Sequence, residues 1–216
     1  MVNLCGLYAI ADTSLIPTNQ LRHTALQAIL GGARLIQYRD KNNDSPTRAR
    51  DAAMLQNLCR EHHVLFIVND DVQLAQSVQA DGVHLGRTDT GLDSARSLLG
   101  KDAIIGISCY NQWQRAITAN NEGADYVAFG RFFPSQSKPD ALAADPQLLQ
   151  DAHSQLTIPT VAIGGITPDN GDQLIKAGAN MLAVIHGLFG QPDVRVTARR
   201  YSQLFDCGQE KNDSIP

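Results

Sequence analysis

The sequence carries no excess of positive charge, no long apolar run and no targeting segment. Its 216 residues hold 18 Lys and Arg against 22 Asp and Glu, so the net charge of −4 does not favour nucleic acid as a partner. No window approaches the roughly 18 apolar residues of a transmembrane helix. The start of the chain lacks the basic and apolar regions of a signal peptide, so we expect a cytoplasmic protein with no membrane partner.

Cysteine is also scarce, and its spacing excludes the common metal motifs. The four cysteines form no CxxC pair and no Cys/His ligand spacing. We therefore expect Cys5, Cys59, Cys109 and Cys207 to be free thiols in a reducing compartment. With so little net charge, any anion-binding site must be local, built from a few Arg, Lys and backbone N–H groups.

What the chain does have is a regular alternation of short apolar runs and longer amphipathic segments. The runs are continuously apolar, which is typical of buried parallel strands. The predicted strands are Leu4–Ile10, Arg34–Tyr38, Val64–Asn69, Gly82–Leu85, Ile104–Ser108, Tyr126–Gly130, Thr160–Ile163 and Met181–Ile185. The predicted helices are Thr18–Leu30, Ser45–His62, Asp71–Gln79, Gly91–Leu99, Asn111–Glu122, Asp145–Gln155, Thr167–Lys176 and Gln191–Phe205.

A repeated Gly-Ala step supports this periodicity. Gly32, Gly123 and Gly178 each precede an Ala at the point where a predicted helix gives way to a strand. Glycine suits the left-handed residue that ends a helix. Repeated strand–helix units in one chain of this length predict a single-domain α/β fold, a (β/α)8 TIM barrel over residues 1–207. A doubly wound open sheet is the main alternative, and the polar residues 208–216 are predicted to form a disordered tail.

Polar clusters follow most of the predicted strands, and in a parallel barrel they all emerge at the end that carries the chemistry. Asn69, Asp70 and Asp71 follow the third strand, and Asp89 follows the fourth. Two carboxylates from neighbouring strand ends, with positions left open for phosphate oxygens, suit Mg²⁺. Asp71 is expected only to cap the next helix. For Asp70 and Asp89, metal binding and an ordinary surface role are both open at this stage.

Two further clusters suit phosphate groups. Gln37, Arg39 and Lys41 alternate and so point the same way from an extended segment, as a diphosphate clamp would require. Ser135, Gln136, Ser137 and Lys138 form a loop whose hydroxyls, N–H groups and ammonium can hold a phosphate. Each cluster taken alone fits a solvated strand end or a surface turn equally well.

The last two strands end in the pattern of a barrel phosphate site. Gly164-Gly165 follows the seventh strand, and Ile185-His186-Gly187 follows the eighth. Other candidates have plainer interpretations. His84 on its apolar strand is expected to be a hydrogen-bonded core histidine, and Tyr110 to pack on the fifth helix.

Taken together, these clusters resemble the thiamine phosphate synthase (thiamine-phosphate pyrophosphorylase) family from about Leu7 to Ile185. The family pattern runs Q-Y-R-[DE]-K, N-D-D, D-G-[VI]-H-[LV]-G-x-x-D, G-[VI]-S, G-x-x-[FY]-x-[TS]-x-[TS]-K and G-G-I. Each motif occurs here, in that order and at suitable spacing. One such motif arises by chance; six in order are specific.

The resemblance implies an enzyme that joins 4-amino-2-methyl-5-hydroxymethylpyrimidine diphosphate to a thiazole phosphate. Diphosphate leaves first, and the resulting pyrimidine methylene cation is captured by the thiazole nitrogen. By resemblance, Mg²⁺ held by Asp70 and Asp89 stabilises the leaving group together with Arg39 and Lys138. Contacts to the pyrimidine diphosphate map onto Gln37, Tyr38, Arg39, Asp40, Lys41, Asn69 and Ser108. The thiazole phosphate pocket maps onto Ser135, Gln136, Ser137, Gly165, Ile185 and His186.

This chain departs from the family pattern at a few positions. Ser135 and Ser137 replace the usual Thr, His186 stands where Ser is common, and Asp40 replaces Glu. A thiazole tautomerase and a non-catalytic thiazole-phosphate binding protein are the competing hypotheses, together with a phosphate-binding barrel of the tryptophan pathway. The metal carboxylates and the Q-Y-R-D-K cluster together favour the synthase.

Overall fold

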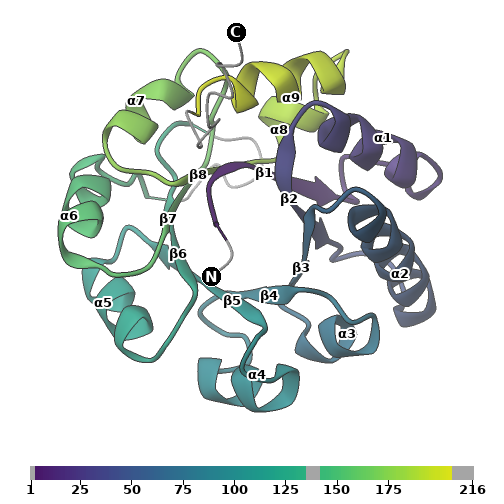
Figure 1. Cartoon of the computed structure of the whole chain (residues 1–216), viewed down its shortest axis with the longest axis horizontal. Helices are drawn as coiled ribbons and strands as arrows, with labels where there is room; N and C mark the ends of the chain where they lie inside the picture. Colours follow the sequence, from purple (N-terminus) through teal and green to yellow (C-terminus); the bar gives the residue numbers. More distant parts are fainter. Residues whose placement is uncertain (1–2, 135–141, 206–216) are drawn as a thin grey trace, which may run out of the picture.

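The computed structural model describes residues 3–134 and 142–205. Its strands form a closed parallel barrel in chain order, with β8 beside β1, and the helices surround the ring (Figure 1). The strands are β1 (Gly6–Asp12), β2 (Ala33–Arg39), β3 (Leu65–Asn69), β4 (Gly82–Leu85), β5 (Ile104–Tyr110), β6 (Tyr126–Gly130), β7 (Thr160–Ile163) and β8 (Met181–Val184). The predicted (β/α)8 barrel is confirmed, and the open sheet is excluded.

The predicted helices are present, some with shifted ends, and a short helix that was not predicted, α8, follows the last strand. They are α1 (Thr18–Leu30), α2 (Ser45–Glu61), α3 (Val72–Ser77), α4 (Leu92–Leu99), α5 (Trp113–Asn121), α6 (Gln147–Gln155), α7 (Gly171–Lys176), α8 (His186–Phe189) and α9 (Val194–Ser202). Helix α7 begins later than Thr167, because Asn170 accepts the Thr167 N–H at 2.8 Å in a turn that precedes the helix. The short α8 leads into α9, which packs beside α1 and closes the ring (Figure 1).

Alternation along the strands divides the apolar residues into two groups. One group fills the barrel interior, and the other lies between the strands and the helices. The interior group includes Tyr8, Leu35, Ile67, Tyr126 and Met181. Gly106 on β5 leaves the space that the Tyr126 ring fills, since a Cβ there would lie 1.9 Å from a ring atom. The interior is therefore packed side chains, as is usual for this fold.

At the amino end of the barrel, three hydrogen bonds of the same kind join neighbouring strands. A side chain just before an even-numbered strand accepts the backbone N–H of a residue on the strand before it, each at 2.8 Å. The pairs are Asp81 with Phe66, Asp125 with Ile105, and Asn180 with Thr160. The expected helix-ending glycines lie nearby with positive φ: Gly32 at 104°, Gly123 at 84° and Gly178 at 114°.

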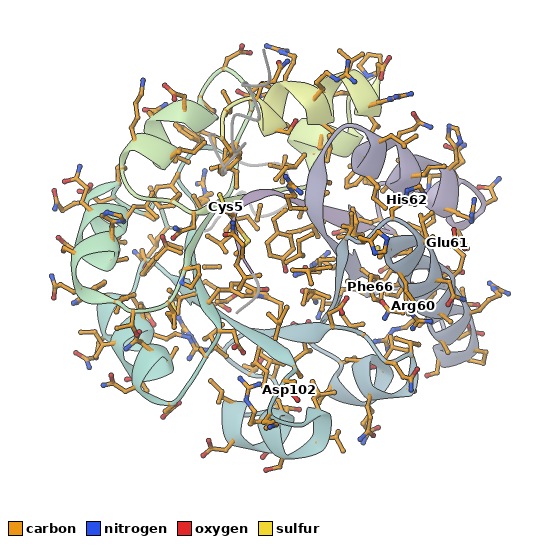
Figure 2. The ribbon with its side chains drawn as sticks, viewed as in Figure 1. Cys5, Arg60, Glu61, His62, Phe66 and Asp102 are labelled. Carbon is orange, nitrogen blue, oxygen red and sulfur yellow. The ribbon has the colours of Figure 1, made fainter. Side chains whose placement is uncertain are left out.

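The cysteines differ from the expectation at one position. Cys59 and Cys109 are free and buried, and burial raises the pKa of both thiols to about 12. Cys5, which precedes β1 and is labelled in Figure 2, is disulfide-bonded, so the expectation of a free thiol there was wrong. Spacing along the chain does not show which sulfur atoms the fold brings together. Cys207 and the predicted tail at 208–216 lie outside the described residues.

Charged side chains are spread over the outside of the helix ring, as Arg60, Glu61 and His62 at the end of α2 illustrate (Figure 2). None of the helices that the structure describes combines the length and the apolar character needed to cross a membrane.

Candidate active site

A cavity of about 340 Å³ opens at the carboxyl ends of the strands. Its lining includes many of the residues singled out from the sequence: Gln37, Arg39, Asn69, Ser108, Gly165, Ile185 and His186. The barrel brings these together from five strands and the loops that follow them. Ser135, Gln136, Ser137 and Lys138 lie outside the described residues.

Arg39, the last residue of β2, is held by a buried carboxylate. Its Nη1 donates to Oδ2 of Asp12, which ends β1 and is 3% exposed. The other oxygen of Asp12 accepts the Ser14 N–H at 2.9 Å and the Ser14 hydroxyl at 2.6 Å. Arg39 is therefore oriented before any ligand arrives, and its partly exposed side chain lines the cavity.

A chain of hydrogen bonds crosses the floor of the cavity from Gln37 to Ser108. The Gln37 amide donates to the Tyr8 hydroxyl, which lies 2.8 Å from the Tyr126 hydroxyl. His84 stacks on Tyr126, with Nδ1 at 3.0 Å from that hydroxyl and Nε2 at 2.8 Å from Ser108 Oγ. His84 is hydrogen-bonded, as expected, but it lines the cavity.

Because the Gln37 amide donates at the start of this chain, one proton arrangement lets both tyrosine hydroxyls donate to the next group along it. Tyr8 accepts from Gln37 and donates to Tyr126, and Tyr126 donates to His84 Nδ1. His84 then donates from Nε2 to Ser108, whose own proton is left for the cavity. Burial raises the pKa of both tyrosines far above the usual range, so both remain protonated donors.

The two candidate metal ligands, Asp70 and Asp89, lie side by side on the loops that follow β3 and β4, and neither is among the residues that line the cavity. The Lys41 ammonium pairs with the Asp70 carboxylate, and Gly86 N–H donates to Asp89 Oδ2 at 2.7 Å. Burial, together with the neighbouring Asp70, raises the pKa of Asp89. Two adjacent carboxylates favour a bound cation, and Mg²⁺ is commonly held by one or two carboxylates plus substrate phosphates. These residues fit Mg²⁺.

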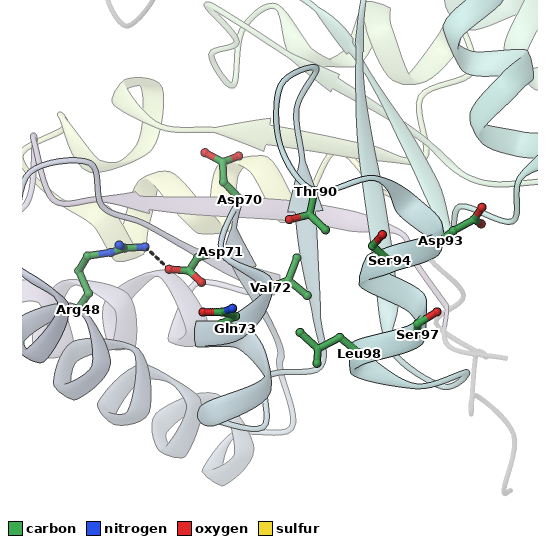
Figure 3. Close-up of a pocket in the computed structure, with 10 residues that line it drawn as sticks. All are labelled: Arg48, Asp70, Asp71, Val72, Gln73, Thr90, Asp93, Ser94, Ser97 and Leu98. Carbon is green, nitrogen blue, oxygen red and sulfur yellow. Dashed lines mark hydrogen bonds and ion pairs between the residues drawn. The ribbon is translucent and has the colours of Figure 1, made fainter.

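Asp71 has the structural role expected for it. Its Oδ1 caps α3 by accepting Leu74 N–H at 2.9 Å, and its Oδ2 accepts from Arg48 at 2.8 Å. Figure 3 shows this ion pair beside an outer cleft of about 880 Å³ between α3 and α4, with Asp70 pointing away from the pair. Asp70 and Asp71 both line this outer cleft, although only Asp71 takes part in the ion pair with Arg48.

Tyr38 and Asp40 are directed away from the cavity. Tyr38 belongs to the apolar layer under the helices, and its hydroxyl donates to Asp40 at 2.8 Å. Asp40 also accepts the backbone N–H groups of Asn42 and Asn43, each at 3.0 Å. Burial raises the pKa of Asp40, but these hydrogen bonds outweigh burial and hold it well below the usual range. Both side chains organise the loop that carries Lys41.

The other side of the cavity is shaped by close backbone approaches. Gly165 has φ of 65°, and a Cβ there would lie 2.3 Å from the Pro134 carbonyl oxygen. A Cβ on Gly187 would lie 2.2 Å from the Ile166 carbonyl oxygen, to which Tyr201 also donates at 2.8 Å. Both positions require glycine, because a side chain would clash with the neighbouring carbonyl oxygen. Backbone therefore forms the cavity wall next to His186.

Several residues that line or support the cavity were not identified from the sequence. Asp12 follows the first apolar run, so the strand-end pattern applied to β1 could have found it. Tyr8 and Tyr126 gave no signal, because a tyrosine in an apolar strand is ordinarily core. Tyr110 was expected on a helix, but it ends β5 with φ of 57° and lines the cavity, as Arg131 does.

A closed parallel barrel with a polar, preorganised cavity at the carboxyl ends of its strands defines the class of (β/α)8-barrel enzymes. A family model described as thiamine monophosphate synthase matches residues 7–188. A thiamine-phosphate synthase of Nitrosococcus oceani is 52% identical over 200 residues, 93% of this chain and 92% of that protein. One from Alcanivorax borkumensis is 49% identical over 213 residues, 99% of this chain and 98% of that one.

Solved structures agree. The thiamine phosphate pyrophosphorylase of Pyrococcus furiosus superposes with a TM-score of 0.85 at 35% identity, covering 94% of this chain and 96% of that one. The chain belongs to the thiamine monophosphate synthase family, and it is a pyrimidinylmethyl transferase that forms thiamine phosphate. The family and the activity implied by the sequence motifs are thereby confirmed.

Proposed function

We propose that the cavity binds the pyrimidine diphosphate beside β2 to β5 and the thiazole phosphate beside β6 to β8. The observation that carries this division is the placement of the polar groups. Side-chain donors occupy the first half, with Arg39, Asn69 and Ser108 among them. The second half offers close-packed backbone at Gly165 and beside His186.

The reaction breaks the bond between the pyrimidine methylene carbon and the diphosphate oxygen, and the electron pair leaves with the oxygen. Thiazole nitrogen then donates its lone pair to the cationic carbon. Asp70 and Asp89 would hold Mg²⁺, which supplies positive charge to the departing diphosphate. Arg39 adds a cation whose position Asp12 has already fixed, and electrostatic preorganisation of this kind is commonly the largest contribution to catalysis.

The hydrogen-bond chain gives Ser108 a defined role. With His84 donating to Ser108, the serine proton is directed to an acceptor in the cavity, and we assign that acceptor to the diphosphate. Gln37 anchors the far end of the chain, so the amide that would contact the pyrimidine also sets the direction of the hydroxyl protons. No side chain needs to act as a nucleophile, because positioning and charge suffice.

The remaining predicted contacts divide into two groups. Lys41 belongs with the diphosphate and metal groups, given its pairing with Asp70. Tyr38 and Asp40 contribute by holding the loop in place. Lys138 and the hydroxyls of Ser135 and Ser137 remain predicted phosphate contacts from the sequence motif, as does Gln136.

The direct test is a coupling assay with both purified substrates, measuring thiamine phosphate and diphosphate with Mg²⁺ and with a chelator. We expect product only when both substrates and Mg²⁺ are present. A dissociative mechanism also predicts slow diphosphate release, with water capturing the carbon, when the thiazole is omitted. Full activity in chelator would contradict the metal assignment, and strict dependence of diphosphate release on thiazole would contradict the dissociative order.

A further inference from the structure

Arg115, on α5 outside the barrel, contacts the backbone behind two functional residues. Its Nε donates to the Ser108 carbonyl at 2.6 Å, and its Nη2 donates to the Gly86 carbonyl at 3.0 Å. We infer that Arg115 is a positioning residue that sets Ser108 and Asp89 relative to one another. This inference rests on the proposed function, which assigns those two residues to the diphosphate and the metal.

Arg115 contacts the two strands just beyond the point where the pairing between β4 and β5 ends. Pairing between β4 and β5 ends at Leu85 with Ile107, and Gly86 and Ser108 are the next residues. On its other side, β5 shifts register against β6 between Ser108 and Tyr110. Ser108 pairs with Ala128 of β6 just before this shift but has no paired residue on β4, so the ladder holds it on one side only. One planar guanidinium joins the two carbonyls there.

Gly86 connects Arg115 to Asp89 through its two backbone hydrogen bonds. Its carbonyl accepts from Arg115, and its N–H donates to Asp89 Oδ2 at 2.7 Å. A second contact links the same segments, with the Arg87 guanidinium 5.0 Å from the centre of the Tyr110 ring. Movement of the Gly86 peptide would therefore displace the carboxylate, and movement of the Ser108 backbone would displace its hydroxyl.

The fork geometry of arginine is needed for this contact. Two of its nitrogens donate in fixed directions, whereas lysine supplies a single flexible ammonium that can serve one carbonyl at a time. Arg96 offers a natural control. It likewise bridges backbone carbonyls, those of Ala103 and Gly123, and pairs with Asp125 at 2.7 Å, but at the amino end of the barrel.

The experiment compares Arg115→Met, Arg115→Lys and Arg96→Met with the wild-type enzyme. Three quantities are measured: thermal unfolding without ligands, steady-state kinetics, and calorimetric binding of inorganic diphosphate in the presence of Mg²⁺. Methionine keeps most of the buried methylene packing of arginine. If Arg115→Met does not fold, Arg115→Lys is the variant that decides.

For Arg115→Met we expect kcat to fall by about 10- to 100-fold, the scale of a misplacement near 1 Å, while the thiazole phosphate KM changes by less than about twofold. Diphosphate binding with Mg²⁺ should weaken by about fivefold or more, and Arg115→Lys should recover only part of either loss. Arg96→Met should lower the unfolding temperature and leave kcat and diphosphate binding unchanged.

Two results overturn the inference. The first is wild-type kcat and diphosphate binding in either Arg115 variant. The second is a lowered unfolding temperature in those variants with kinetics like those of Arg96→Met, which would make Arg115 purely structural. Wild-type enzyme whose turnover and diphosphate binding ignore Mg²⁺ is a separate failure, because it refutes the proposed metal role and removes the Asp89 half of the inference with it.

Discussion

The side-chain contacts at the two ends of this barrel differ in kind. At the amino end, Asp81, Asp125 and Asn180 repeat one contact, each accepting a backbone N–H from the neighbouring strand at 2.8 Å. Near the carboxyl end the polar side chains differ from strand to strand: Asp12, Arg39 and Ser108 each make a different set of contacts. The repeated hydrogen bonds at the amino end hold neighbouring strands together, which the closed sheet requires. The differing contacts at the carboxyl end position side chains for the ligand.

The largest effect should come from the carboxylate pair at the carboxyl end. We expect Asp70→Asn or Asp89→Asn to lower kcat by about 10³-fold, near the upper end for removing one preorganised electrostatic contact. The unfolding temperature should change little, because both residues lie on the loops that follow β3 and β4. Kinetics over a range of Mg²⁺ concentrations check this. If both variants kept the Mg²⁺ dependence of the wild-type enzyme, these carboxylates would not be metal ligands, and the functional difference between the two ends of the barrel would be lost.

Arg39 can be compared with an arginine five residues earlier on the same strand. Arg39→Ala should slow diphosphate departure by about 10²-fold in single-turnover assays, since it removes a donor used mainly in the transition state. Arg34→Ala is the matched control, because Arg34 is exposed at the amino end of β2. If both substitutions slowed diphosphate departure only slightly and equally, the cluster of Gln37, Arg39 and Lys41 would not act as a diphosphate clamp.

The hydrogen-bond chain predicts coupling between residues that do not touch. Ser108→Ala and Tyr8→Phe should each lower kcat, Tyr8→Phe by about tenfold, and the double variant should be little worse than Ser108→Ala alone. The reason is that Tyr8 acts through the direction of the serine proton. A double-mutant cycle measures this. Strictly additive losses would mean that the two hydroxyls act independently.

His186 should matter least among the cavity residues. If backbone groups beside Gly165 and Gly187 hold the thiazole phosphate, His186→Ser changes its KM by no more than about threefold, because those donors remain. The thiazole phosphate KM is measured for both proteins under the same conditions. A large rise in this KM on substitution would identify the imidazole itself as the phosphate ligand.

At the amino end the effect should be on stability alone. Asp125→Ala leaves the Ile105 N–H and Arg96 without their shared carboxylate, so we expect a loss of about 1–3 kcal/mol in the free energy of unfolding. For a chain of this size that lowers the unfolding temperature by roughly 2–12 °C. The kcat of the folded enzyme should be unchanged. A selective loss of kcat would show that the amino end takes part in the reaction.

The sequence by itself determined the strands, the fold class and the family. Continuous apolar runs mark strands that are buried on both faces, and glycines mark the helix ends, because both patterns follow from local geometry. The strand-end clusters predicted the cavity lining at Gln37, Arg39 and Asn69, since parallel strands bring their carboxyl ends together. The alternation that turns Gln37 and Arg39 toward the cavity turns Tyr38 outward, so the same pattern would have separated Tyr38 from its neighbours.

Only the tertiary structure decided which distant groups meet. Asp12 fixes Arg39 across two strands, and Tyr8 reaches Tyr126 over 118 residues of chain, contacts that no spacing in the sequence encodes. The same holds for the bonded Cys5 and for Arg115, a helix residue that binds two strand ends from outside. Tyr110 became a cavity residue because a register shift in β5 changed its direction. Such contacts depend on barrel closure, which sets every strand against its neighbours at once.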